Sequence, residues 1–188
     1  MKRFLTIAAV ILFASSAMAQ GTYTYGWTIS SSIADPYVNT GTPPMGMITL
    51  YLWYACSLEE GMSAAEFDLS GTIVPFAANA NAGAGWLNAG TATQLQLAIG
   101  GCPVGPSYAM MLFANDFGGF LDIVASSAWP TPVTVDCGVL ADPTTHASDW
   151  IGYCSDGGPA HGTVTAETIC VPVSVEDKTW GTIKSLYR

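Results

Sequence analysis

Histidine, the side chain that most often acts as a general base, is scarce in this sequence. The chain holds two histidines, His146 and His161, and each is flanked by Gly, Pro or Thr residues that predict a loop. A hydrolase could combine one of them with Asp149 or Asp156 and a nearby serine. No Gly-x-Ser-x-Gly, His-Glu-x-x-His or phosphate-binding glycine motif accompanies them. We therefore predict exposed loop histidines, no catalytic residues and a protein that is not an enzyme.

Acidic side chains could support two other kinds of site. Paired carboxylates can hydrolyse glycosides, but Glu59-Glu60 is typical of a solvated turn, and Glu66 with Asp68 of a strand face in water. Four other aspartates could meet around calcium: Asp116, Asp122, Asp142 and Asp156. Their spacing does not match an EF-hand loop. We predict no cofactor and no metal ligand, and calcium stays an open alternative.

Five cysteines are the remaining reactive side chains: Cys56, Cys102, Cys137, Cys154 and Cys170. Their spacing is irregular and contains no Cys-x-x-Cys pair, which disfavours zinc. In an exported protein the expected state is two disulfides and one thiol, each bridge contributing about 2–4 kcal/mol. The sequence leaves the pairing open, as well as the identity of the free cysteine.

Residues 1–19 predict a secretory signal peptide. A charged start, an apolar stretch over residues 4–13 and a small-x-small cleavage site ending at Ala19 follow one another. The apolar stretch is too short to span a bilayer comfortably, and no later segment is long enough. We expect a chain beginning at Gln20 that is secreted, periplasmic or on the cell surface, without membrane insertion after cleavage.

Charge is strongly segregated along the chain. All fourteen acids lie between Asp35 and Asp177, whereas no Lys or Arg occurs from Leu5 through Asp177. An acidic body repels phosphate backbones and anionic headgroups, which argues against nucleic acid as a partner. Because ion pairs are scarce, cohesion must come from apolar burial and backbone hydrogen bonds.

Short segments with alternating or continuous apolar residues predict an all-β fold. The central strand is Met47 to Cys56, apolar on both faces and therefore expected to be covered on two sides. The best hairpin signal joins 108–114 to 120–125, and 77–90 is predicted as a loop. The other predicted strands are 22–33, 65–69, 73–76, 94–99, 133–137, 150–154, 162–165 and 168–175.

This pattern indicates one antiparallel β-sandwich over residues 20–177, immunoglobulin-like or cohesin-like (jelly-roll). Residues 178–188 form a basic amphipathic tail, in which Thr179 could cap a short helix. That helix would place Trp180, Ile183, Leu186 and Tyr187 on one face. The face either docks on the chain's own sandwich or serves as a tag for an export machine or neighbouring subunit.

Aromatic residues provide the other binding signal. Trp53 is predicted to be in the core, whereas Trp86 and Trp129 fall in loop-like surroundings. Their rings could stack on a sugar or a protein partner, or each could plug one end of the sandwich.

Several short sequence motifs in the chain resemble those of a known group of proteins. The ending Thr-Trp-Gly-x-Ile-Lys-x-Leu-Tyr-Arg and the upstream Leu-Tyr-x-Trp-x-x-Cys-Ser and Ile-Gly-Gly-Cys-Pro resemble uncharacterised secreted bacterial β-sandwich proteins. More weakly, Ala-Ala-Glu-Phe-Asp-Leu followed by Gly-Thr-Ile-Val resembles cohesin-like modules, which bind other proteins. The resemblance implies a similar exported β domain, and it carries over no catalytic residues.

These observations predict an exported, non-catalytic structural or adhesive component that contacts a protein partner or another cell-surface component. A carbohydrate-binding module that uses Trp86 or Trp129 is the second interpretation, and a secreted hydrolase is the third. The ligand, the oligomeric state and the pathway are not determined by the sequence.

Overall fold

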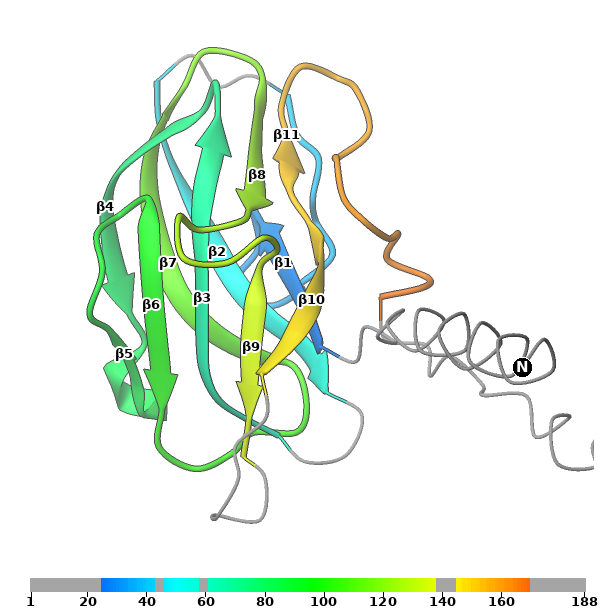
Figure 1. Cartoon of the computed structure of the whole chain (residues 1–188). Coiled ribbons are helices and arrows are strands. Elements are labelled where there is room, and N and C mark those ends of the chain that lie inside the picture. Colours follow the sequence, from blue (N-terminus) through cyan, green and yellow to red (C-terminus); the bar gives the residue numbers. More distant parts are fainter. Residues whose placement is uncertain (1–24, 43–45, 58–60, 138–144, 170–188) are drawn as a thin grey trace, which may run out of the picture.

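The computed structural model describes residues 25–42, 46–57, 61–137 and 145–169. In these ranges the chain is an antiparallel β-sandwich with one 3-10 turn, η1 (Ala82–Ala84), and no α-helix (Figure 1). No helix in the described ranges is long and apolar enough to cross a membrane. The predicted signal peptide and the basic tail lie outside them.

The first sheet has the strand order β4, β7, β2, β1. The long strand β2 pairs with β1 on one side and β7 on the other, which confirms the predicted central strand. Its alternate residues Leu50, Leu52 and Tyr54 are fully buried in the core. The bounds are β1 (Tyr25–Ser30), β2 (Gly46–Ser57), β4 (Val74–Ala80) and β7 (Ser107–Asp116).

The second sheet is organised around β3 (Met62–Gly71). One edge of β3 pairs with β6, which in turn pairs with β5. The other edge pairs with β9 and then, further along the same strand, with β8, whose far edge pairs with β11. The bounds are β5 (Trp86–Asn88), β6 (Gln94–Ile99), β8 (Phe120–Val124), β9 (Val133–Asp136) and β11 (Tyr153–Cys154).

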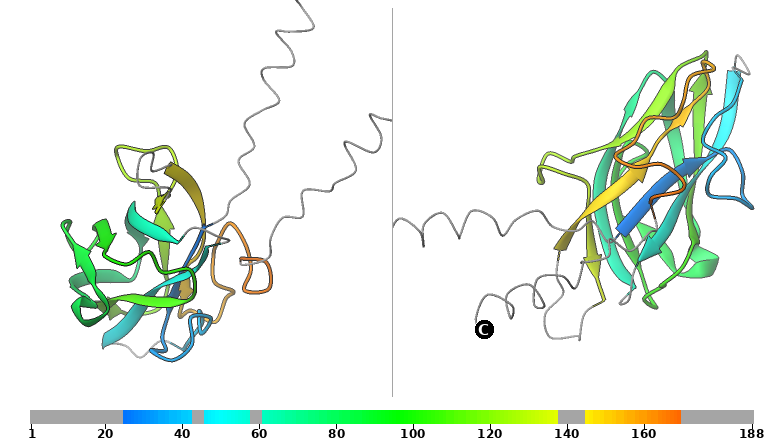
Figure 2. Two further views of the ribbon diagram at one scale, coloured as in Figure 1. Left: turned by 90° about the horizontal axis from the view of Figure 1, so that it is seen from below. Right: turned by 90° about the vertical axis from the view of Figure 1, so that its right-hand side faces the viewer.

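Strand β10 (Thr145–Ile151) belongs to both sheets. Its first residues pair antiparallel with β9, and its last residues pair parallel with β1. The segment that follows β11, coloured orange in Figure 2, packs back across this side of the sandwich. It ends with Ile169, which is buried with Cys56 and Ile151 in a small second cluster.

The main core lies between the two sheets and is rich in aromatic rings. Trp27 on β1 is fully buried and contacts Tyr54, Phe67 and Trp86 with centroid distances of 5.1–5.9 Å. These large rings come from both sheets, so they lock the two layers together by apolar burial.

Several local predictions were wrong. The segments 108–114 and 120–125 form β7 and β8, which do not pair with each other because the turn between them crosses from one sheet to the other. Residues 77–90 contain the end of β4, η1 and β5 instead of a loop alone. Residues 162–165 form only an isolated bridge at Gly162. The predicted strand 168–175 lies mostly outside the described residues.

The central strand is also less covered than expected. The outward face of β2 is half-buried at Thr49 and Tyr51 and buried only toward the end of the strand. There Trp53 packs against Tyr108 and donates its indole N–H to the carbonyl of Ser32. At the other end, Met47 is 75% exposed. Trp53 is thus buried as predicted, although it lies on the outer side of the first sheet and not between the sheets.

Candidate functional site

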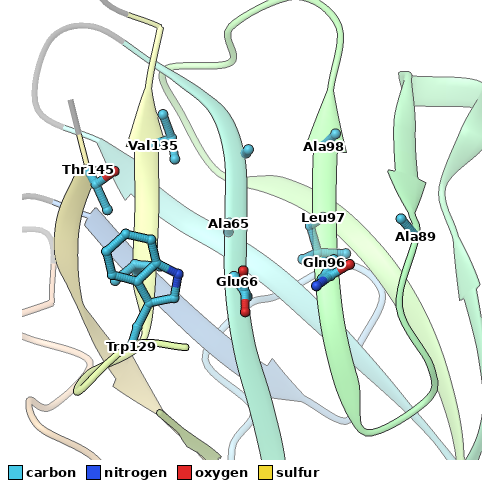
Figure 3. A pocket seen from close by; sticks show the side chains of 11 residues that line it. Ala65, Glu66, Ala89, Gln96, Leu97, Ala98, Trp129, Val135 and Thr145 are labelled. Atoms are coloured by element: carbon cyan, nitrogen blue, oxygen red, sulfur yellow. The ribbon is translucent and has the colours of Figure 1, made fainter. Parts of the chain in front are cut away.

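A shallow groove crosses the outer face of the second sheet. It has a volume of about 300 Å³ and is mostly apolar (Figure 3). Its floor and walls come from β3, β6, β9 and β10 and from the two loops beside them. The lining residues are Ala64, Ala65, Glu66, Ala89, Gln96, Leu97, Ala98, Trp129, Val133, Val135 and Thr145.

The register of the strands explains why this face is apolar. Cross-strand partners form one continuous row over five strands: Leu87, Ala98, Ala64, Val135 and Thr145. Cross-strand neighbours lie about 4.5–5.5 Å apart, so the row is a band of small or apolar side chains. Leu87 at one end of the row is 65% exposed.

Trp129 forms one side of the groove. It lies in the loop that connects β8 to β9, the two strands that pair in turn with the same edge of β3. Its side chain remains 41% exposed (Figure 3). The base of this loop is fixed because the Ser126 hydroxyl donates a 2.9 Å hydrogen bond to Glu66 Oε1. A carboxylate on β3 therefore holds the loop that presents the indole.

Trp86 has a different role. Its side chain is fully buried between Trp27 and Tyr54, and its indole N–H donates to the Ser107 hydroxyl at 3.1 Å. In this position neither face of the ring is open to a sugar or a partner. Of the two tryptophans predicted as ligand contacts, the structure places only Trp129 at the surface.

The two histidines are each paired with an aspartate that the sequence did not indicate. His146 Nε2 lies 2.8 Å from Asp136 Oδ2, and His161 Nδ1 lies 3.0 Å from Asp122 Oδ2. His146 lies within β10, so its predicted loop placement was wrong. Each pair ties one segment to its neighbour: Asp136 and His146 join β9 to β10, and Asp122 and His161 join β8 to the segment that follows β11.

The aspartates predicted to partner the histidines form other hydrogen bonds. Asp149 accepts a hydrogen bond from the Thr163 hydroxyl, and burial raises the pKa of its carboxyl. Asp156 accepts from the thiol of Cys154 at 2.9 Å and from the backbone N–H of Gly158, and these hydrogen bonds lower its pKa.

The described acids considered for calcium each have another partner. Asp116 is fully buried and accepts from Ser155 and from the backbone of Gly118, whereas Asp122 pairs with His161. Asp142, like Glu59 and Glu60, lies outside the described residues. Among the residues that are described, no group of three His, Cys, Asp or Glu side chains is arranged to hold a metal ion.

The cysteines include a disulfide between Cys102 and Cys137, 35 residues apart, which joins the loop before β7 to the end of β9. Cys56 is also disulfide-bonded. Cys154 is free and buried, and its burial raises the pKa of the thiol above 9.0. A buried, protonated thiol is a poor nucleophile. Cys170 and the predicted tail-docking residues Trp180, Ile183, Leu186 and Tyr187 lie outside the described residues.

Sequence reasoning missed most of the groove. The alternation in 94–99 indicates that Gln96 and Ala98 share a face, but it cannot indicate that Ala64 and Val135 lie beside them. That neighbourhood depends on the register between strands far apart in the sequence.

Comparisons with known proteins show likenesses only in structure. No protein-family model matches the chain, and no curated protein matches its sequence significantly. One similar solved structure is the sixth cohesin of scaffoldin B from Acetivibrio cellulolyticus, crystallised in complex with a Cel5 dockerin. Its TM-score is 0.48 at 13% identity, over 71% of this chain and 98% of that chain. Another is the seventh ScaB type I cohesin from Pseudobacteroides cellulosolvens, with a TM-score of 0.48 at 8% identity, over 70% of this chain and 90% of that chain.

Proposed function

We propose that this protein is an exported, non-catalytic protein-interaction module that binds its partner in the Trp129 groove. The observation that carries the proposal is the apolar row of Leu87, Ala98, Ala64 and Val135 beside a half-exposed indole. Exposed apolar bands on a rigid sheet are typical of protein-binding surfaces, and tryptophan is enriched among residues that dominate binding energy.

Charge defines the chemistry of the partner. Glu66 lines the groove, and Asp68 follows it on the same face of β3. The described residues contain no Lys or Arg, since all five in the sequence lie at positions 2, 3, 178, 184 and 188. The groove therefore favours a polypeptide segment that combines an apolar side chain with a basic one. A location outside the cytoplasm is supported by the Cys102–Cys137 disulfide.

The proposal can be tested by capture from the native cell surface with the immobilised mature protein. We expect a specific partner to be lost with Trp129→Ala and with Ala98→Arg, which places a bulky cation in the groove. The matched controls are Phe117→Ala, another exposed aromatic residue at 72%, and Asn79→Arg on the outer face of β4. Capture that survives both groove variants would contradict the proposal.

The same variants test the carbohydrate interpretation. Among the tryptophans that the structure describes, Trp129 is the exposed one, so binding to a glycan array that is lost in Trp129→Ala and kept in Phe117→Ala would assign the groove to sugars instead of a protein.

A further inference from the structure

The groove and the C-terminal tail are complementary in charge. Glu66 and Asp68 face outward on β3, and no cationic Lys or Arg side chain exists anywhere in the described body to pair with them. The sequence holds three cations after residue 177, namely Lys178, Lys184 and Arg188. In a chain that begins at Gln20, these three are the Lys and Arg side chains of the protein itself that could meet the acids of the groove.

The tail also carries the apolar side chains that the groove lacks. Trp180, Ile183 and Leu186 recur every third residue between the cations. A groove of about 300 Å³ lies at the lower end of the size of ligand pockets, which is enough for one or two such side chains. The floor is made of Ala64 and Ala98, whose small side chains let an incoming residue approach the sheet closely.

The described chain ends close enough to the groove for the tail to reach it. Ile169 is buried and packs on Gly26 so closely that a Cβ at position 26 would lie 2.7 Å from its Cγ1. Gly26 lies opposite Asp149 on β10, and Ala147 of β10 lies opposite Val133 in the groove. Two strand spacings and two residues along β10 amount to about 12 Å. The eleven residues from Ile169 to Trp180 can span up to about 36 Å.

We propose that the chain's own tail, residues 178–188, occupies the Trp129 groove intramolecularly. An apolar tail residue lies beside Trp129 and a tail lysine faces Glu66 and Asp68. This inference rests on the proposed function, because it takes the groove to be a polypeptide-binding site. A tethered segment acts at an effective concentration of the order of millimolar, so an external partner must displace it.

Photo-crosslinking of the full mature chain tests this arrangement directly. With benzoylphenylalanine at position 183, we expect crosslinks at the mass of one chain that map to peptides of β3, β6 or β9. Glu66→Lys should reduce their yield severalfold, and adding Lys184→Glu should restore it. Crosslinks at the mass of two chains, crosslinks that map to β1, β2, β4 or β7, or a yield that Glu66→Lys leaves unchanged would each overturn the proposal.

A labelled peptide of residues 177–188 gives an independent measurement on the full chain. A tail variant with Trp180→Ala, Ile183→Ala and Leu186→Ala should bind this peptide at least severalfold more tightly than the wild type, whose groove is already filled. Trp129→Ala in the tail variant should abolish binding, and Phe117→Ala should not. Failure of the tail variant to bind the peptide overturns this inference alone, because capture of a cell-surface partner through Trp129 would still support the proposed function.

Discussion

The indole N–H of Trp27 donates a 2.9 Å hydrogen bond to the hydroxyl of Thr134, 107 residues away and on the opposite sheet. The Thr134 hydroxyl is in turn 2.7 Å from that of Ser148 on β10. All three side chains are buried, so this short polar chain joins the first sheet, the second sheet and the strand that belongs to both.

Replacing Thr134, the middle residue of this hydrogen-bonded chain, should lower the free energy of unfolding. Thr134→Val keeps the shape of the side chain but leaves the Trp27 N–H and the Ser148 hydroxyl buried without their partner. We expect a loss of about 1–3 kcal/mol in the free energy of unfolding, measured by urea denaturation. Ser148→Ala removes one end only and should cost less, about 0.5–1.5 kcal/mol. A Thr134→Val protein as stable as the wild type would refute a structural role for the chain.

Replacing Trp86 or Trp129, the two tryptophans with predicted binding roles, should lower the free energy of unfolding by very different amounts. Trp86→Ala removes a fully buried ring from the aromatic core and should cost about 3–5 kcal/mol. Trp129→Ala removes a half-exposed ring and should cost about 1 kcal/mol or less. Thermal unfolding of the two variants makes the comparison. Equal losses would mean that Trp129 is part of the core, and the groove variants would then be unsuitable for binding tests.

Most of the strands themselves were predictable from the sequence, whereas their assignment to one sheet or the other was not. Continuous apolar or alternating segments predicted β2, β3, β6 and β7 because burial of a strand face leaves a period of two in the sequence. The same reasoning failed at the β7–β8 connection. A turn of Asn, Asp and Gly residues indicates a reversal of the chain, but it does not indicate whether the second strand stays in the same sheet.

The site was less predictable than the fold for a related reason. Trp86 follows a segment rich in Ala, Asn and Gly, and its three-residue strand is too short to leave a periodic signal. Asp136 meets His146 because β9 and β10 are paired, and the apolar row beneath Trp129 likewise depends on which strands are neighbours in the second sheet. Asp122 on β8 meets His161 because the segment after β11 packs beside that strand. Residue types at a site can be proposed from sequence, whereas neighbours across strands need the register.

Disulfide mapping is the third prediction. Cys102 pairs with Cys137, Cys56 is disulfide-bonded and Cys154 is free, so the fifth cysteine, Cys170, is the expected partner of Cys56. Peptide mapping of the unreduced protein should recover both pairs and one alkylated peptide that contains Cys154, labelled only after unfolding.

Removing the Cys102–Cys137 bridge should also be measurable. The double variant Cys102→Ala with Cys137→Ala releases a loop of 35 residues and should lose about 4 kcal/mol in the free energy of unfolding. Cys154→Ala serves as the control that removes a cysteine without a bridge. Recovery of a Cys154 disulfide in the mapping would show that this assignment is wrong.

The pH dependence of Asp149 is the fourth prediction. Burial raises the pKa of its carboxyl above the ordinary value of 3.8 and outweighs the hydrogen bond from Thr163 that lowers it. A carboxyl whose pKa is raised by folding favours the folded state in its protonated form, so its ionisation costs stability as the pH rises through its ordinary pKa. Asp149→Asn should therefore stabilise the protein at pH 7, by about 1 kcal/mol or less for a half-buried group. The gain should vanish below pH 3, where both forms are neutral.

The pKa of Asp156 is shifted in the opposite direction to that of Asp149. Its pKa is lowered first by the hydrogen bond from the Cys154 thiol and then by that from the Gly158 N–H, so its charged form is the one that folding favours. Asp156→Asn should lower the melting temperature at pH 7 and have no effect at pH 2, whereas Asp149→Asn should raise it at pH 7. Both variants remove one negative charge, so relief of general repulsion in an acidic protein would raise both melting temperatures. A shift in the same direction for the two variants would thus attribute the effect to net charge and contradict the local assignment.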